Sequence, residues 1–215
     1  MRSVVLITSI FIFISCRSQI KSNTEINNMK KFDVNQYTDL PTDDITGMKI
    51  QKNGDMIQYF PNNNGYILKI KKKNKPFIQT FVYNDKLNLV AEGNDFYNFP
   101  INSIKEYDET GKLIKETNLD LPYKFLVEDL AKKMKTDYDI DIYDIKQIHD
   151  INRCEEKKHL NTPLYEVYCN HKTNPLKLVC YIINGTTGET LYVGERFIEG
   201  KQGSLLDQYL NSKKN

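Results

Sequence analysis

Hydrophobic and polar residues follow three successive patterns along this chain. The first is an almost unbroken apolar run from Val4 to Ile14, which a single positive charge at Arg2 precedes. A helix that spans a membrane needs about 18 or more apolar residues, whereas the core of an export signal needs about 7–15. The run is therefore too short to span stably, and it predicts an export signal over residues 1–15.

The second pattern consists of short runs in which apolar and polar residues alternate and which turn residues interrupt. Examples of such turns are residues 62–65 (Asn-Asn-Asn-Gly) and 108–111 (Asp-Glu-Thr-Gly), where Gly65 and Gly111 are expected to supply a positive φ. A turn of this kind roughly every dozen residues indicates antiparallel hairpins. We therefore expect residues 32–119 to form an antiparallel β-hairpin or meander region.

The third pattern begins after residue 120 with a helical period. Leu126, Leu130 and Met134 recur at helical spacing, with acidic residues early in this stretch and lysines late. That order of charges complements the helix dipole, so we expect a helix over about residues 124–135. A set of extended runs and a short amphipathic helix are expected to follow, at about 142–153, 164–169, 176–183 and 190–197, and at 205–210.

Together these patterns predict an α+β fold. Its N-terminal antiparallel β-hairpin or meander region, residues 32–119, is followed by a small domain of one helix packed on an antiparallel sheet, residues 120–215. Residues 16–31 are polar with few large apolar side chains. Such a segment cannot bury enough apolar surface to offset the entropy of ordering, so we expect a flexible tether there.

The end of the apolar run, Phe13-Ile14-Ser15-Cys16, resembles the lipobox of bacterial lipoproteins, although that family usually has an aliphatic residue at the place of Phe13. The resemblance implies cleavage before Cys16, its acylation, with palmitate among the expected chains, and attachment to a membrane. Arg17 stands where an aspartate often retains lipoproteins in the inner membrane, so the analogy favours the outer membrane, facing the periplasm. The alternative is an ordinary signal cleaved after Ser18, which leaves a soluble periplasmic or secreted protein.

Two further resemblances concern the two halves of the chain. Residues 105–116, Lys-Glu-Tyr-Asp-Glu-Thr-Gly-Lys-Leu-Ile-Lys-Glu, are similar to the MORN-variant hairpin repeats of antitoxin-like bacterial proteins. Residues 181–191, Tyr-Ile-Ile-Asn-Gly-Thr-Thr-Gly-Glu-Thr-Leu, resemble the PepSY-type domain of peptidase propeptides and exported proteins. The first resemblance supports hairpins. The second implies a binding or inhibitory module, because that family domain carries no catalytic residues.

The net charge and the absence of known catalytic motifs argue against several classes of function. The chain has 30 Lys and Arg against 28 Asp and Glu, so that the loss of Arg2 with the signal leaves an excess of one positive charge. A nearly neutral exported protein has no electrostatic reason to prefer nucleic acid, which we exclude as a partner. The sequence contains no motif of a serine nucleophile, a zinc protease or a phosphate-binding glycine loop, and we expect no cofactor.

The cysteines leave two options open. With Cys16 acylated, Cys154, Cys169 and Cys180 remain, an odd number for an oxidising compartment. Cys169 ends one expected strand and Cys180 lies in the next, so a disulfide between them is one option, for which Cys154 competes. Free cysteines that pack as small apolar side chains are the other option.

Three histidines form the candidate site of an alternative, enzymatic function. His149, His159 and His171 lie near cysteines in the C-terminal half, but the spacings Cys-x4-His and Cys-x-His match no closed zinc module. Surface histidines and structural cysteines explain the pattern better than a metal site does. The alternative function is an exported hydrolase or metal-dependent enzyme with a site around these three histidines.

The leading hypothesis is a non-enzymatic, lipid-anchored binding protein of the cell envelope that acts through protein–protein contacts. Its partner would be a toxin that an immunity- or antitoxin-type lipoprotein neutralises, or an exported peptidase that it inhibits. Fourteen tyrosines and no tryptophan supply amphipathic side chains. Tyrosine suits protein interfaces, and exposed β-strands are expected to explain most of these residues.

Overall fold

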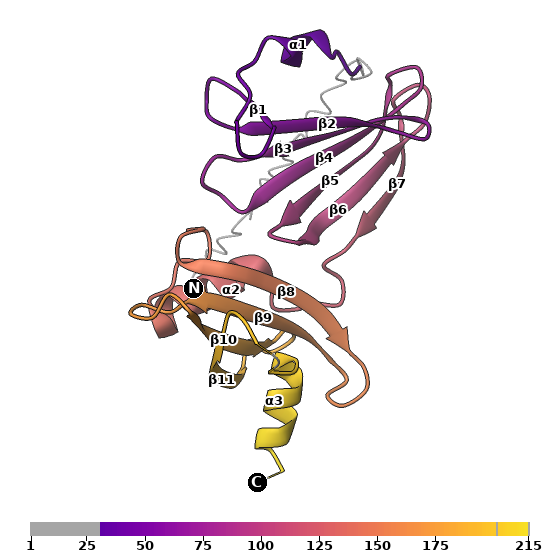
Figure 1. Ribbon diagram of the computed structural model, residues 1–215. Coiled ribbons are helices and arrows are strands. Elements are labelled where there is room, and N and C mark those ends of the chain that lie inside the picture. Colours follow the sequence, from indigo (N-terminus) through magenta and orange to yellow (C-terminus); the bar gives the residue numbers. More distant parts are fainter. Residues whose placement is uncertain (1–30, 201, 215) are drawn as a thin grey trace, which may run out of the picture.

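The computed structural model describes residues 31–200 and 202–214, which form two antiparallel sheets and three helices (Figure 1). The elements of the N-terminal part are α1 (Asn35–Thr38), β1 (Lys49–Ile50), β2 (Met56–Asn62), β3 (Gly65–Lys71), β4 (Phe77–Asn84), β5 (Leu89–Phe96), β6 (Phe99–Tyr107) and β7 (Leu113–Asn118). Those of the C-terminal part are α2 (Val127–Tyr138), β8 (Ile148–Glu156), β9 (Thr162–Asn170), β10 (Lys177–Asn184), β11 (Thr190–Phe197) and α3 (Leu205–Ser212).

Both sheets are antiparallel meanders, which confirms the α+β class. The first sheet has seven strands in the order of the chain, β1 to β7, and the second has four in the order β11-β10-β9-β8. Gly65 and Gly111 have φ values of 145° and 81°, as the turns require. Among the described residues, no helix is long and apolar enough to cross a membrane.

Helix α2 begins at Val127, three residues later than the sequence indicates. Residues just before it are tied to the second sheet: the N–H of Phe125 donates to the carbonyl of Gly185 at 3.0 Å, and the carbonyl of Phe125 accepts from the hydroxyl of Tyr165 at 3.0 Å. The N–H of Leu126 then donates to the carboxylate of Asp129 at 3.1 Å, which caps the first turn. Long-range contacts thus decide where the helix starts.

Strand β8 also begins later than expected, at Ile148 instead of near residue 142. The aspartates that precede β8 stabilise turns. Asp141 accepts the N–H of Tyr143 at 2.9 Å, and Asp144 accepts that of Lys146 at 3.0 Å. Side-chain oxygens that bind the main chain two residues ahead favour turns over strands.

The two sheets share one hydrophobic core. Phe96, Phe99 and Ile101 from β5 and β6 lie in the same buried cluster as Val127, Leu130 and Met134 of α2 and the inner residues of β8, β9 and β10. A second cluster joins the outer face of the four-stranded sheet to α3, and a third lies between the seven-stranded sheet and residues 32–40. Residues 32–119 and 120–215 therefore form two sheets that share the first cluster, while the second and third clusters belong to one sheet each.

The fourteen tyrosines belong to these interior clusters and their borders. All of them lie in the described part of the chain, where none is exposed and five are buried. Several of their hydroxyls reach polar partners, as when Tyr97 donates to the carbonyl of Ile142 at 3.0 Å. Burial raises the pKa of Tyr83 and Tyr181 to about 12. The expectation that most tyrosines lie on exposed strands is wrong.

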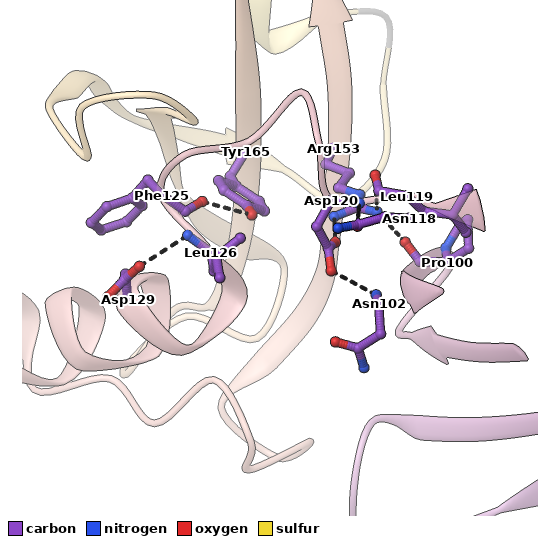
Figure 2. A network of polar contacts seen from close by, with 10 residues as sticks. All are labelled: Pro100, Asn102, Asn118, Leu119, Asp120, Phe125, Leu126, Asp129, Arg153 and Tyr165. Atoms are coloured by element: carbon purple, nitrogen blue, oxygen red, sulfur yellow. Dashed lines mark hydrogen bonds and ion pairs between the residues drawn. The ribbon is translucent and has the colours of Figure 1, made fainter. Parts of the chain in front are cut away.

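Arg153 of β8 connects the two sheets (Figure 2). Its side chain is only 6% exposed, and its Nη1 lies 2.6 Å from a carboxylate oxygen of Asp120. Its Nη2 donates to the carbonyls of Pro100 and Leu119. The guanidinium carbon lies 4.9 Å from the ring centre of Phe99, and 4.7 Å from that of Tyr123.

Asp120 extends this network to a bulge in β6. Its second carboxylate oxygen accepts the N–H of Asn102 at 2.7 Å, and Asn102 has a φ of 59°. At this residue the pairing of β5 with β6 is irregular, because Glu92 pairs with Lys105 while Asn94 pairs with Ile101. The carboxylate therefore holds the bulge and the arginine at the same time.

We predict that Arg153→Met lowers the free energy of unfolding by about 3–5 kcal/mol, because it leaves Asp120 and two carbonyls without their buried partner. Arg153→Met combined with Asp120→Asn is expected to cost less than the sum of the two single variants. Denaturation in urea measures both values. The control is Lys157→Met, which removes an ion pair with Glu155 whose lysine side chain is 76% exposed, and is expected to change stability by less than about 0.5 kcal/mol. A cost below about 1 kcal/mol for Arg153→Met would contradict the prediction.

Candidate binding surfaces

One face of the seven-stranded sheet carries an apolar stripe that crosses four strands. Phe60 of β2 pairs with Ile67 of β3, Ile67 with Val82 of β4, and Val82 with Ala91 of β5. Residues that are direct cross-strand partners lie on the same face of a sheet. The stripe ends at β6, where the partner of Ala91 is the polar residue Glu106. The carboxylate of Glu106 lies 2.9 Å from the Nζ of Lys115.

A hollow of about 350 Å³ lies over this stripe. Gly93 helps to form it because it contributes no side chain there; an added Cβ would come 3.4 Å from Cγ1 of Ile104, which forms part of the wall. Lys69, Thr80 and Asp95 supply polar groups at its border. We call this surface, the stripe with its hollow, the open face.

The opposite face of the same sheet is covered. Phe32, which precedes α1, packs against Tyr66 and Tyr83 with ring centres 5.2 and 5.1 Å away, and joins Ile57 and Leu68 in a buried cluster. None of the three buried clusters in the described part of the chain contains a residue of the apolar stripe. The stripe residues are half-buried, so among the described residues this face is less covered than the opposite one.

A larger pocket, of about 800 Å³, lies in the C-terminal part, and we call it the helix-end pocket. Its walls come from the last turn of α2, the segment before β8, the end of β9 with the turn after it, and β10. Cys169, Val179 and Tyr181 form its floor on the face that α2 covers, and Tyr138 packs on Tyr181 with ring centres 4.5 Å apart. Lys135, Lys146 and Lys172 bring positive charge to the same pocket.

His171 also lines this pocket, where it holds the turn between β9 and β10. Its Nδ1 accepts the main-chain N–H groups of Thr173 at 3.2 Å and of Asn174 at 3.1 Å. Its Nε2 faces a carboxylate oxygen of Glu195 at 3.6 Å. The imidazole thus has a structural partner on each side.

The structure does not bring the three histidines together, and the candidate site around His149, His159 and His171 is wrong in this respect. His149 and His171 lie at one end of the β8–β9 hairpin, while His159 lies beyond the other end, past the pair of Glu156 with Thr162. Eight residues of strand at about 3.3 Å each separate the two ends by roughly 26 Å. Residues 31–200 and 202–214 contain no group of three or more His, Cys, Asp or Glu residues that could hold a metal ion.

The three cysteines of the described residues, Cys154, Cys169 and Cys180, are free, and a disulfide between Cys169 and Cys180 is not formed. The register pairs Cys169 with Val179, and Cys180 with Tyr168, so the two cysteines differ by one position. A shift of one residue turns a side chain to the opposite face of a sheet. Cys169 accordingly packs in the core under α2 and Cys180 in the cluster under α3, while Cys154 is exposed. Cys16 lies outside the described residues.

Sequence reasoning missed both surfaces. The signal for the open face is the run Phe77–Tyr83, in which apolar residues fall on both faces of the strand instead of alternating with polar ones. The helix-end pocket has no comparable local signal, because its lining comes from four separate segments. No protein-family model matches the chain, and comparisons with curated proteins and with solved structures find no match either. The resemblances to MORN-variant repeats and to the PepSY-type domain stay predictions.

We predict that a maleimide labels one thiol in the folded Cys16→Ala chain and three in urea. Cys154 is exposed, whereas burial raises the pKa of the Cys169 and Cys180 thiols to about 12 and keeps them as unreactive thiols. Intact mass after labelling counts the adducts. Cys154→Ser in the same background is the control and should leave no fast-reacting thiol. If only one thiol instead of three were labelled in urea without a reductant, the other two would form a disulfide. That result would contradict the prediction that all three cysteines are free.

Proposed function

We propose that this chain is a non-catalytic binding protein of the bacterial cell envelope. A lipid at Cys16 would hold it at the outer membrane, facing the periplasm, and the open face would bind a partner protein. The observation that carries the proposal is the apolar stripe of Phe60, Ile67, Val82 and Ala91, whose half-buried side chains belong to none of the buried clusters of the described residues.

The dimensions of the open face suit a protein partner. Four paired strands at about 4.8 Å spacing make the stripe about 14 Å long, on a surface that is only shallowly hollowed. Contiguous apolar patches with a polar border are typical of protein–protein contacts. Lys69, Asp95 and the pair of Glu106 with Lys115 supply such a border. A rigid sheet also presents these side chains without a cost for ordering a loop.

The predicted export signal and the two family resemblances suggest the class of the partner protein. The apolar run before Cys16 predicts export, and the repeat and domain resemblances favour a toxin or an exported peptidase as the protein that is bound. The dispersed histidines agree with this proposal, because the enzyme alternative relied on their meeting.

We predict that the protein made in a bacterial host is found in the membrane fraction and carries a diacylglyceryl and acyl mass increase on residue 16. The increase and the membrane association should both be lost in Cys16→Ala, because no other cysteine follows the apolar run closely. Intact mass and fractionation measure this. An unmodified, soluble chain that starts after Ser18 would refute the anchor and leave the binding face to be tested separately.

We predict that a photo-crosslinker in place of Thr80, on the open face, captures one major partner in the envelope of the native host. Ile67→Thr combined with Val82→Thr should reduce this adduct at least tenfold, because it removes the centre of the stripe while it keeps β-branched side chains in the strands.

The matched control for this experiment is Val193→Thr, the same exchange at a 50% exposed position of β11 in the other sheet, which should leave the adduct unchanged. A crosslinker in place of Thr38 tests the covered side of the same sheet. Equal capture from both positions, or an adduct that survives the double exchange, would contradict binding through the open face.

A further inference from the structure

We propose that the helix-end pocket binds an organic anion with an apolar body of about the size of a fatty acid. This site lies on the four-stranded sheet, away from the open face, and does not depend on the function proposed above. The position of the pocket at the end of α2, its apolar floor and its positive charge suit such a ligand.

The pocket exists because α2 is too short for the sheet that it covers. Twelve residues of helix extend about 18 Å, whereas the nine residues of β9 extend about 30 Å. Asp139 ends the helix with a φ of 56°, and the N–H groups of Asp139 and Ile140 bond back to the last turn. Beyond this point the pocket lies between the end of the helix and the inner face of β9 and β10.

The floor of the pocket is apolar. Cys169 and Val179 are direct cross-strand partners on the inner face, and Tyr181 follows on the same face of β10. Ile140 and Tyr138 close the side next to the helix. A volume of about 800 Å³ lies in the range of small-molecule sites, so a ligand with a chain or ring system can cover this floor.

The charged groups select an anion. Three lysines and one aspartate line the pocket, and Asp139 is already paired with Lys135. Among the described residues, Lys146 and Lys172 form no direct ion pair, although the charge of Lys146 lowers the pKa of Asp144 and that of Lys172 lowers the pKa of Asp139. The carbonyls at the end of α2 oppose an anion with about half a charge, and the lining keeps an excess of positive charge because three lysines face one aspartate there. A ligand whose carboxylate lies between Lys146 and Lys172 and whose apolar body lies on the floor would use both the charged and the apolar half of the site.

The absence of tryptophan from the chain makes a local test feasible. In the full chain, Thr173→Trp places the sole indole at the border of the pocket, and Ile114→Trp places it on β7 of the other sheet. Dodecanoate is the probe, used below its micelle concentration. We expect a saturable change in the emission of the Thr173→Trp protein with a dissociation constant in the micromolar range, and no change in the Ile114→Trp protein.

Charge and shape variants in the Thr173→Trp background test the two halves of the site. Lys146→Glu with Lys172→Glu should weaken dodecanoate binding at least tenfold, whereas the control Lys52→Glu with Lys124→Glu, two exposed lysines outside the pocket, should not. Val179→Phe fills the floor and should also weaken binding, and circular dichroism confirms that each variant is folded. Dodecyltrimethylammonium, with the same chain and the opposite charge, should not bind.

Three results would overturn the inference. These are no saturable response to dodecanoate, equal binding after reversal of the two pocket lysines, or equal binding of the cationic analogue. A response that is the same with both indole reporters would also place the probe elsewhere in the molecule, since Ile114 belongs to the other sheet. The crosslinking experiment on the open face is independent of each of these outcomes.

Discussion

The buried pair of Arg153 and Asp120 is the contact on which the arrangement of the two sheets depends. Charges are costly to bury, and such a pair persists only when every donor and acceptor finds a partner. Here the guanidinium reaches one carboxylate and two carbonyls and lies against the rings of Phe99 and Tyr123. Because Arg153 lies in β8 and its partners come from β6 and from the connection between the sheets, the network holds the two sheets together.

The bulge in β6 explains why the first sheet contributes to the core of the second. Before the bulge, Phe99 and Ile101 point into the cluster beneath α2; after it, the strand continues in the seven-stranded sheet. Asn102 adopts a positive φ at the turning point, and Asp120 accepts its N–H. An asparagine tolerates this conformation better than most residues. The same carboxylate therefore stabilises the local irregularity and the long-range contact.

The sequence predicted the features that have local causes. Hairpins follow from period-two alternation, and the turns at Gly65 and Gly111 follow from the need for positive φ. The start of α2 was misplaced because Phe125 is held by Gly185 and Tyr165, which are distant in sequence. The two candidate surfaces were missed for the same reason. Phe60, Ile67, Val82 and Ala91 are unequally spaced in sequence, and only the strand register aligns them.

Several acids and one histidine of the turns serve the fold. A catalytic acid or base needs a pKa near the working pH and a free path to substrate. Here the main-chain N–H of Leu160 lowers the pKa of Glu156, and that of Lys146 lowers the pKa of Asp144, so both carboxylates serve as turn acceptors. His171 is held in the same way by two N–H groups. These acids and His171 stabilise the ends of the strands, whereas the open face and the helix-end pocket have apolar floors. Molecular recognition by rigid sheets is the function that we propose for these two surfaces.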